Sequence, residues 1–492
     1  MATNIAQMGE LEGTLLDLDK TTNGILHFFT AFKLAKLLSA FDRIKGKGTD
    51  VSTLLLSLIV FRLRNESISM MQRPQKNFLA HIDDNTFYRL MNNPWMDWRR
   101  LLMGLAKQFM AHVRARADAC TVHCCFVIDD TLVQKTGASI EFISRVFDHV
   151  TKLYPLGYKL LLLSYYDGKS LLAADFSLHR EQGVKGDYGL SAKELRSQNH
   201  KLRDDGSPGL QRAREVDMEK GAAALAMLKR AAKNGMMASY VLMDSWFVSD
   251  YMIKGVRSIR KGAMHLLGMC KNDKRKYGAK NKELNAKQLV TRYERTRGKY
   301  SRKYRSRYIQ MDTDYKGADV RLFLIRYNNS PNWTVLLTTD MKLAFAKAME
   351  LYQVRWTIET LFKECKQYLR LGCSQNTDFD GQVADMAISL AAHTILTLQK
   401  RFGDYETFGE LFRETQQHLL ELTLWERLIR AFLKLLTQLT QVFCLDVDDT
   451  MRRLAQCGPG AQQIVAILNL LAQPSNNGPI TAKNANQAIT PI

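Results

Sequence analysis

The stretch Leu351–Lys366, which reads LYQVRWTIETLFKECK, constrains this chain more than any other. If it is a helix with about 100° per residue, four polar side chains fall within one arc about 60° wide. They are Tyr352, Arg355, Glu359 and Lys366. Apolar residues fill the neighbouring arc, so one face packs and the row beside it stays available. One acid among groups that bind phosphate indicates a site that handles phosphate, with a metal ion.

Composition narrows the class of partner. The 492 residues include 70 Lys and Arg against 49 Asp and Glu, a formal charge of +21. Such an excess favours a polyanion, most often nucleic acid. The sequence contains no uncharged apolar run of about 18 residues and no signal-peptide pattern at its start. Its eight Cys are irregularly spaced, which is typical of reduced thiols. We therefore expect a cytoplasmic protein with no membrane partner.

The periodicity of apolar residues changes along the chain. Helical spacing dominates residues 1–118, a region that either binds DNA ends or serves as scaffold. From Cys124 onward short apolar runs alternate with helical segments, which predicts a mixed α/β core. The predicted strands of this core are 124–130, 158–166, 170–179, 240–244 and 265–270, and the predicted helices are 219–232 and 245–259.

A basic segment separates this core from the helix described first. Residues 271–308 hold 15 Lys and Arg against three acids, interleaved with tyrosines. This composition of basic and aromatic residues suits binding of the DNA backbone and stacking on bases. The alternative is a solvated loop. The predicted regions are 1–118, a helical N-terminal region; 119–270, the first part of the core; 271–342, a basic β-rich insertion; 343–374, the catalytic Glu helix; 375–472, a C-terminal helical region suited to dimerisation; and 473–492, a disordered tail.

Acidic residues follow two of the predicted strands. Asp129 and Asp130 come after the run CCFVI, and Asp244 comes after YVLM. With Glu359 they would bring carboxylates together from separate elements, which is costly without a cation. Carboxylate oxygens select Mg²⁺ or Mn²⁺, and two such ions about 4 Å apart serve phosphodiester chemistry.

Each acid also has a simpler interpretation. Asp244 could cap the next helix, and the pair Asp129–Asp130 could form a turn. Glu359 could form a surface ion pair with Lys363, four residues later.

Together these residues resemble a known family. The motifs IDDT and MDSW, followed by Y-x2-R-x3-E-x6-K, are similar to the DDE transposases of bacterial insertion sequences that carry the YREK signature, over about residues 120–375. The resemblance implies an RNase H-like mixed-sheet core with a β-strand insertion. It also implies that Asp129, Asp244 and Glu359 hold two Mg²⁺ (or Mn²⁺) ions in each active site. The Thr at position 131 favours Asp129 over Asp130 as the first ligand.

The resemblance further implies cut-and-paste transposition of an insertion sequence. Water nicks the transposon end, the freed 3′-hydroxyl forms a hairpin, the hairpin is reopened, and the end joins target DNA. Trp333 would stack on a base flipped out of the hairpin, worth about 1–3 kcal/mol, or would simply pack. The other residues expected to contact DNA are Tyr352, Arg355, Lys366, Arg302, Lys303 and Arg305.

The implied partners are double-stranded transposon ends with terminal inverted repeats, target DNA, and a second copy of the chain in a synaptic homodimer on the nucleoid. Two other functions stay open. One is an RNase H-like nuclease that cuts without strand transfer. The other is a non-catalytic DNA-binding transposition inhibitor. Intact acids argue against the inhibitor, and the complete YREK row argues against a general nuclease.

Overall fold

The computed structural model describes residues 34–45, 47–72, 82–115, 124–271, 275–278, 283–328, 330–402 and 406–417. The chain divides into two compact units, Met1–Asp84 with Glu410–Ile492, and Asn85–Gly409. None of the helices in the described ranges has the length and apolar character needed to cross a membrane. The predicted tail 473–492 and the predicted C-terminal region beyond residue 417 lie outside the described residues. The predicted domain boundaries stay predictions.

The described part of the first unit contains short helices. They are α2 (Leu34–Ser39), η1 (Asp42–Ile44), α3 (Val51–Leu63) and η2 (Ile68–Gln72). Helical spacing of apolar residues predicts a helix over 51–63, and α3 has those bounds. It buries the aliphatic side chains of Leu54, Leu55, Leu58 and Ile59.

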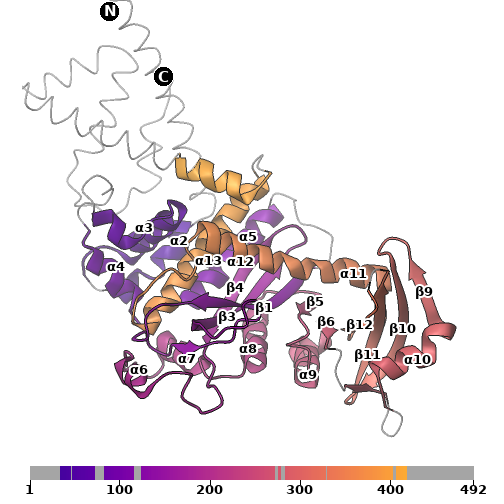
Figure 1. Ribbon diagram of the computed structural model, residues 1–492. Helices are drawn as coiled ribbons and strands as arrows, with labels where there is room; N and C mark the ends of the chain where they lie inside the picture. The colour runs from indigo at the N-terminus through magenta and orange to yellow at the C-terminus, as the bar shows by residue number, and fades with distance from the viewer. Residues whose placement is uncertain are drawn as a thin grey trace, which may run out of the picture. The chain divides into compact units, whose positions relative to one another are not determined.

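The second unit is built on one large mixed sheet (Figure 1). Its strands are β1 (Cys125–Gln134), β2 (Ser144–Arg145), β3 (Leu156–Tyr166), β4 (Leu171–His179), β5 (Tyr240–Met243), β6 (His265–Cys270), β9 (Gly298–Ser301), β10 (Ser306–Tyr315), β11 (Ala318–Tyr327) and β12 (Thr334–Thr338). Strands β7 (Lys276–Tyr277) and β8 (Leu284–Asn285) form a separate two-stranded sheet. The central strands are buried on both faces, which explains why they read as continuous apolar runs.

The strand order β4-β3-β1-β5-β6 defines the core. Strand β3 runs antiparallel to both β1 and β4, whereas β5 and β6 run parallel to β1. Helices cover both faces, because the parallel connections need crossovers. Helices α8 (Lys220–Lys233) and α9 (Asp250–Ser258) contact each other on one side, and α11 (Phe345–Gln353) and α12 (Thr357–Tyr368) contact β6 and β1. This is an RNase H-like α/β core with flanking helices.

The remaining helices of this unit surround the core. They are α4 (Asp84–Met91), α5 (Trp98–Ala115), α6 (Ala192–Ser197), α7 (Pro208–Glu215), η3 (Ile259–Gly262), α10 (Ala286–Arg297), η4 (Val354–Trp356) and α13 (Phe379–Phe402). Helices α5 and α13 pack against each other and against β4.

The basic segment extends the core sheet. Strand β12 pairs antiparallel with β6, and β11, β10 and β9 follow outward (Figure 1). Strands β5 and β6 are parallel and end at the same edge of the sheet. Strands β12, β11 and β10 then alternate in direction. The start of β12, the end of β11 and the start of β10 therefore lie at that same edge. The insertion and the core therefore share one sheet edge.

Three local predictions were wrong. Strand β1 does not stop at the acids but continues to Gln134, because β3 pairs with it along its whole length. The predicted continuous helix from 343 to 370 is α11 and α12 joined by the 3₁₀ turn Val354–Trp356. The high charge of the stretch 180–218 predicts irregular structure, but the stretch contains α6 and α7.

Candidate active site

The sheet brings two of the acids side by side. Ile128 and Met243 are register partners on the parallel strands β1 and β5. Asp129 and Asp244 occupy the next positions, so their backbones are separated by one strand spacing, about 4.8 Å. Strand β5 ends at Met243 while β1 continues. The two carboxylates therefore lie where the parallel pairing stops.

Asp129 and Asp130 point to opposite faces of β1, since successive side chains of a strand alternate. Asp129 accepts a hydrogen bond from Arg355 Nη1 at 3.0 Å, on the face covered by α12. Asp130 accepts one from Lys220 Nζ at 2.5 Å, at the start of α8 on the other face. Of the two, only Asp129 shares a face with Glu359.

Arg355 links Glu359 to this site. Its Nη2 donates to Glu359 Oε1 at 3.0 Å while its Nη1 holds Asp129. Arg355 is 6% exposed, and its Nε is buried without a hydrogen-bond partner among the described residues. Helix α12 is anchored in the core by the buried side chains of Ile358, Leu361, Phe362 and Cys365. This packing fixes the backbone position of Glu359. A buried cation thus bridges two carboxylates and retains one unused donor.

The simpler interpretations of the acids are wrong. Ser249, not Asp244, caps α9, because its side chain accepts from the backbone N–H of Met252 at 3.2 Å. Asp129 and Asp130 lie within a strand and not in a turn. Glu359 pairs with Arg355.

The electrostatics of Asp129 suit a cation. Burial raises the pKa of Asp129 to about 7, and the charges of Asp130 and Asp244 act in the same direction. The backbone N–H of Asp130 and the Arg355 guanidinium act in the opposite direction but do not outweigh burial. The carboxylate therefore carries negative charge that the protein compensates only in part.

The three carboxylates have the chemistry of a Mg²⁺ or Mn²⁺ site. Within the described ranges, no three His, Cys, Asp or Glu side chains are already grouped around a metal position. Arg355 occupies the space between Asp129 and Glu359 instead. The Glu359 side chain is 46% exposed, so it has room to turn toward Asp129 and Asp244. The donor set fits a divalent ion once the guanidinium moves aside.

The other residues of the row on the helix do not form one exposed strip. Tyr352 is 8% exposed, and burial raises its pKa. Lys366 donates to Thr131 Oγ1 at 2.8 Å, on the same face of β1 as Asp129. Arg355 and Lys366 therefore contact β1 two residues apart along one face.

The predicted DNA contacts of the insertion lie along the same sheet edge. Trp333 immediately precedes β12, and the guanidinium of Arg326 lies over its ring at 5.2 Å. Arg302, Lys303 and Arg305 form the turn between β9 and β10, and all three are exposed. A cavity of about 420 Å³ beside Trp333 is lined by Arg307, Arg326, Asn328, Ser330 and Pro331.

The structure adds two exposed aromatic residues that the sequence interpretation did not use. Trp356 is 57% exposed and lies 4.5 Å from the Arg355 guanidinium, ring centroid to Cζ. Trp246 is 43% exposed, and Lys220 Nζ lies 4.1 Å from its ring centroid. From the sequence, Trp246 just after Asp244 is interpreted as a packing residue, and this exposure does not fit that interpretation. Its position two residues after Asp244 was the available signal.

Comparison with known proteins agrees with this geometry. A family model described as the transposase DDE domain matches residues 121–395, more than half of the 492 residues. A search of curated proteins found no match. Members of this family are enzymes that act on DNA with divalent metal ions. The chain, with its RNase H-like sheet and its three carboxylates, belongs to the DDE transposase family.

Proposed function

We propose that this protein is a cut-and-paste transposase of an insertion sequence of the YREK type. The observation that carries the proposal is the neighbouring placement of Asp129 and Asp244, with Glu359 joined to Asp129 through Arg355. General DNA binding needs no group of neighbouring carboxylates of this kind, whose mutual repulsion is costly. The intact acids therefore argue against a non-catalytic inhibitor.

Asp129, Asp244 and Glu359 would hold two divalent ions. When bound, these ions would polarise the scissile phosphate and lower the pKa of the attacking hydroxyl or water. Mg²⁺ is the proposed ion because the ligands are all carboxylate oxygens.

Arg355 has two roles in this proposal. Before DNA and metal bind, it forms ion pairs with Asp129 and Glu359 and compensates part of their charge. Once released, its planar guanidinium can grip a phosphate with paired N–H donors. Its unpartnered Nε provides a further donor for such a ligand. Lys366 reaches the same face of β1 through Thr131, so its ammonium can take a neighbouring phosphate.

The basic edge of the insertion supports a hairpin step. Trp333 and the exposed turn with Arg302, Lys303 and Arg305 lie at the edge where Asp244 follows β5. Arg307 and Arg326 line the cavity beside Trp333. An indole next to cationic side chains suits an unpaired base and its phosphate.

The decisive experiment uses the full chain, Mg²⁺ and a linear DNA fragment that carries one end of the element, taken from the DNA flanking the coding sequence. Hairpin formation and joining to a target plasmid support the proposal. Nicking without hairpin or joining supports a nuclease, and a gel shift without any cleavage supports an inhibitor. Light scattering of the protein–DNA complex tests the proposed synaptic homodimer, which predicts two protein copies with two ends.

Replacing Trp333 with Ala should slow hairpin formation about 5- to 150-fold, which corresponds to the loss of one stacked base, about 1–3 kcal/mol. The first nick should change little. Denaturing gels that separate the nicked strand from the hairpin measure both steps in one reaction. Equal slowing of the nick and the hairpin would mean that Trp333 packs the insertion rather than receives a base. Trp333→Phe keeps an aromatic face and should restore part of the hairpin rate.

A further inference from the structure

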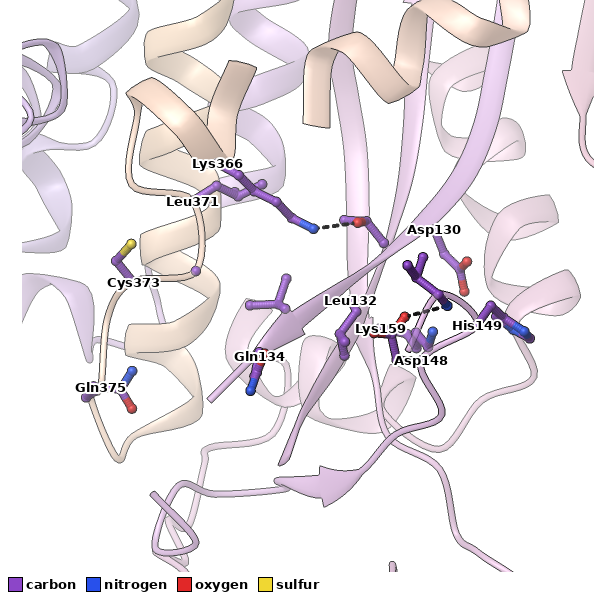
Figure 2. A pocket seen from close by; sticks show the side chains of 14 residues that line it. Asp130, Leu132, Gln134, Asp148, His149, Lys159, Lys366, Leu371, Cys373 and Gln375 are labelled. Atoms are coloured by element: carbon purple, nitrogen blue, oxygen red, sulfur yellow. Dashed lines mark hydrogen bonds between the residues drawn. The ribbon is translucent and has the colours of Figure 1, made fainter. Parts of the chain in front are cut away.

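Beyond the acids, strand β1 forms the wall of an open groove of about 760 Å³ (Figure 2). Residues 130–134 of β1 line it together with the loop 148–150 and the segment 371–375. Two lysines, Lys159 and Lys366, also line it. Lys366 bonds to Thr131 on the active-site face of β1, whereas Lys159 pairs with Leu132 and lies on the Asp130 face, so the groove is lined from both faces of the strand.

Lys159 is an unusual lysine. The residue is a lysine within the central strand β3, where it pairs with Leu132, and it is only 5% exposed. Within the described ranges, the structure records no hydrogen bond and no ion pair for its ammonium. The stem of Lys159 is buried in the sheet while the residue lines the open groove, where a bound anion could provide a hydrogen-bonded counter-charge for its ammonium.

Two acids also line the groove, Asp130 and Asp148, and in the described part of the chain neither forms a hydrogen bond or ion pair with the two lysines. Asp130 pairs with Lys220. Asp148 accepts from the backbone N–H of Val150 at 3.0 Å and from the Thr151 hydroxyl at 2.7 Å, and these bonds lower its pKa, with a smaller contribution from Lys159. Burial lowers the pKa of Lys366; the charge of Asp148 opposes that effect and the charge of Lys159 adds to it.

We propose that Lys159 binds a backbone phosphate of the DNA, extending the contacts of the active site along this groove. The proposal rests on the proposed function, because the groove would carry the same duplex that is cut. Leu132 lies three residues along β1 from Asp129, about 10 Å at 3.3 Å per residue. Lys159 pairs with Leu132, so its side chain lies on the face of β1 that carries Asp130, opposite Asp129 and Thr131. A DNA strand bound by both lysines would therefore pass the part of β1 that extends beyond its pairing with β5.

The chemistry of the groove favours a nucleic acid strand. The groove is open and contains cations, as a polymer that enters and leaves requires. Leu132 and Leu371 provide apolar surface for a sugar between the phosphates. Val150, which is 89% exposed, stands on the loop that lines one side. A buried lysine ammonium is a point charge and suits a phosphate without reading sequence.

The test is the salt dependence of binding to a random-sequence duplex of about 20 base pairs, without divalent metal. Lys159→Met should weaken binding about 5- to 20-fold and reduce the slope of log affinity against log salt by about one. Its Tm should change little, because methionine keeps the buried apolar stem and Lys159 makes no hydrogen bond or ion pair within the described ranges. Lys159→Arg should keep most of the slope. Lys229→Met, on the exposed side of α8 and outside the groove, should leave the slope unchanged.

Two results would overturn the proposal. One is an unchanged slope with a lower Tm in Lys159→Met, which means a structural role. The other is an equal change in Lys229→Met, which means a general charge effect. The binding test needs no catalysis, so its outcome is independent of the cleavage assay. If the wild-type protein cleaves DNA but Lys159→Met binds with an unchanged salt slope, the groove proposal fails and the transposase proposal stands. A protein that never cleaves, but whose slope falls in Lys159→Met, refutes the proposed transposase and keeps the groove.

Discussion

The substitution Asp129→Asn should reduce the nicking rate of an element end at least about a thousandfold. Asp129 is the buried carboxylate that neighbours Asp244 and connects to Glu359 through Arg355. A neutral amide cannot balance the charge of a divalent ion, and metal stabilisation of the developing charge is worth several kcal/mol. About 4 kcal/mol corresponds to a thousandfold. The measurement is the initial rate of nicking in Mg²⁺, beside a gel shift that shows DNA binding is retained.

The matched control is Asp130→Asn, one residue further along the same strand. Asp130 faces α8 and pairs with Lys220, so its loss should leave nicking within about tenfold of wild type. Glu359→Gln should behave like Asp129→Asn. If Asp130→Asn abolishes nicking while Asp129→Asn keeps it, Asp130 is the first ligand and the proposed site must be rebuilt on the α8 face.

The core strands could be predicted because they are buried on both faces and read as apolar runs. Where a strand ends could not be predicted in the same way. Residues 131–134 are less apolar than the start of β1, yet they remain in the strand because β3 supplies partners as far as Gly157. Pairing with a distant segment decides such an end, and a local pattern carries no information about it.

The row of Tyr352, Arg355, Glu359 and Lys366 on the predicted helix indicated which residues form the site. It did not predict how their side chains are arranged. A helical wheel assumes a regular helix, and the 3₁₀ turn Val354–Trp356 changes the rotation between Tyr352 and Glu359. It also says nothing about what covers a side chain. Arg355 reads as an exposed phosphate ligand, but β1 places a carboxylate against it.

Two of the missed helices did carry local signals. Helix α10 begins with a capping box, in which Asn285 and Gln288 bond each other's backbone N–H groups. Helix α7 begins with Ser207 as N-cap and Pro208 at its first position. Both are readable start signals that the high charge of their surroundings obscured. Lys159, by contrast, stands inside the apolar strand YKLLLLSYY, and its exposure to a groove depends on the tertiary fold.

The largest stability effect should come from Asp175, which lies fully buried in β4. It accepts from Arg99 Nε and from Arg230 Nε, both at 2.9 Å, and Arg212 Nη1 lies 3.6 Å away. Burial alone would raise the pKa of Asp175, but the three guanidinium groups bring it below its ordinary value. The cluster ties α5, α7 and α8 to the sheet, and Glu215 is its second acid.

Asp175→Asn leaves three arginines facing one carboxylate, so it should lower the free energy of unfolding by about 3–5 kcal/mol. Denaturant titration at pH 7 measures the loss. The control is Asp217→Asn, which breaks a pair with Arg180 whose acid is 41% exposed, and should cost less than about 1 kcal/mol. Because the folded pKa of Asp175 is lowered, its contribution is present at neutral pH and fades as the pH falls below about 3.9. The gap between wild type and Asp175→Asn should therefore narrow on acidification. A gap that is small at pH 7, or constant with pH, would mean that packing of the helices and not this carboxylate holds the cluster together.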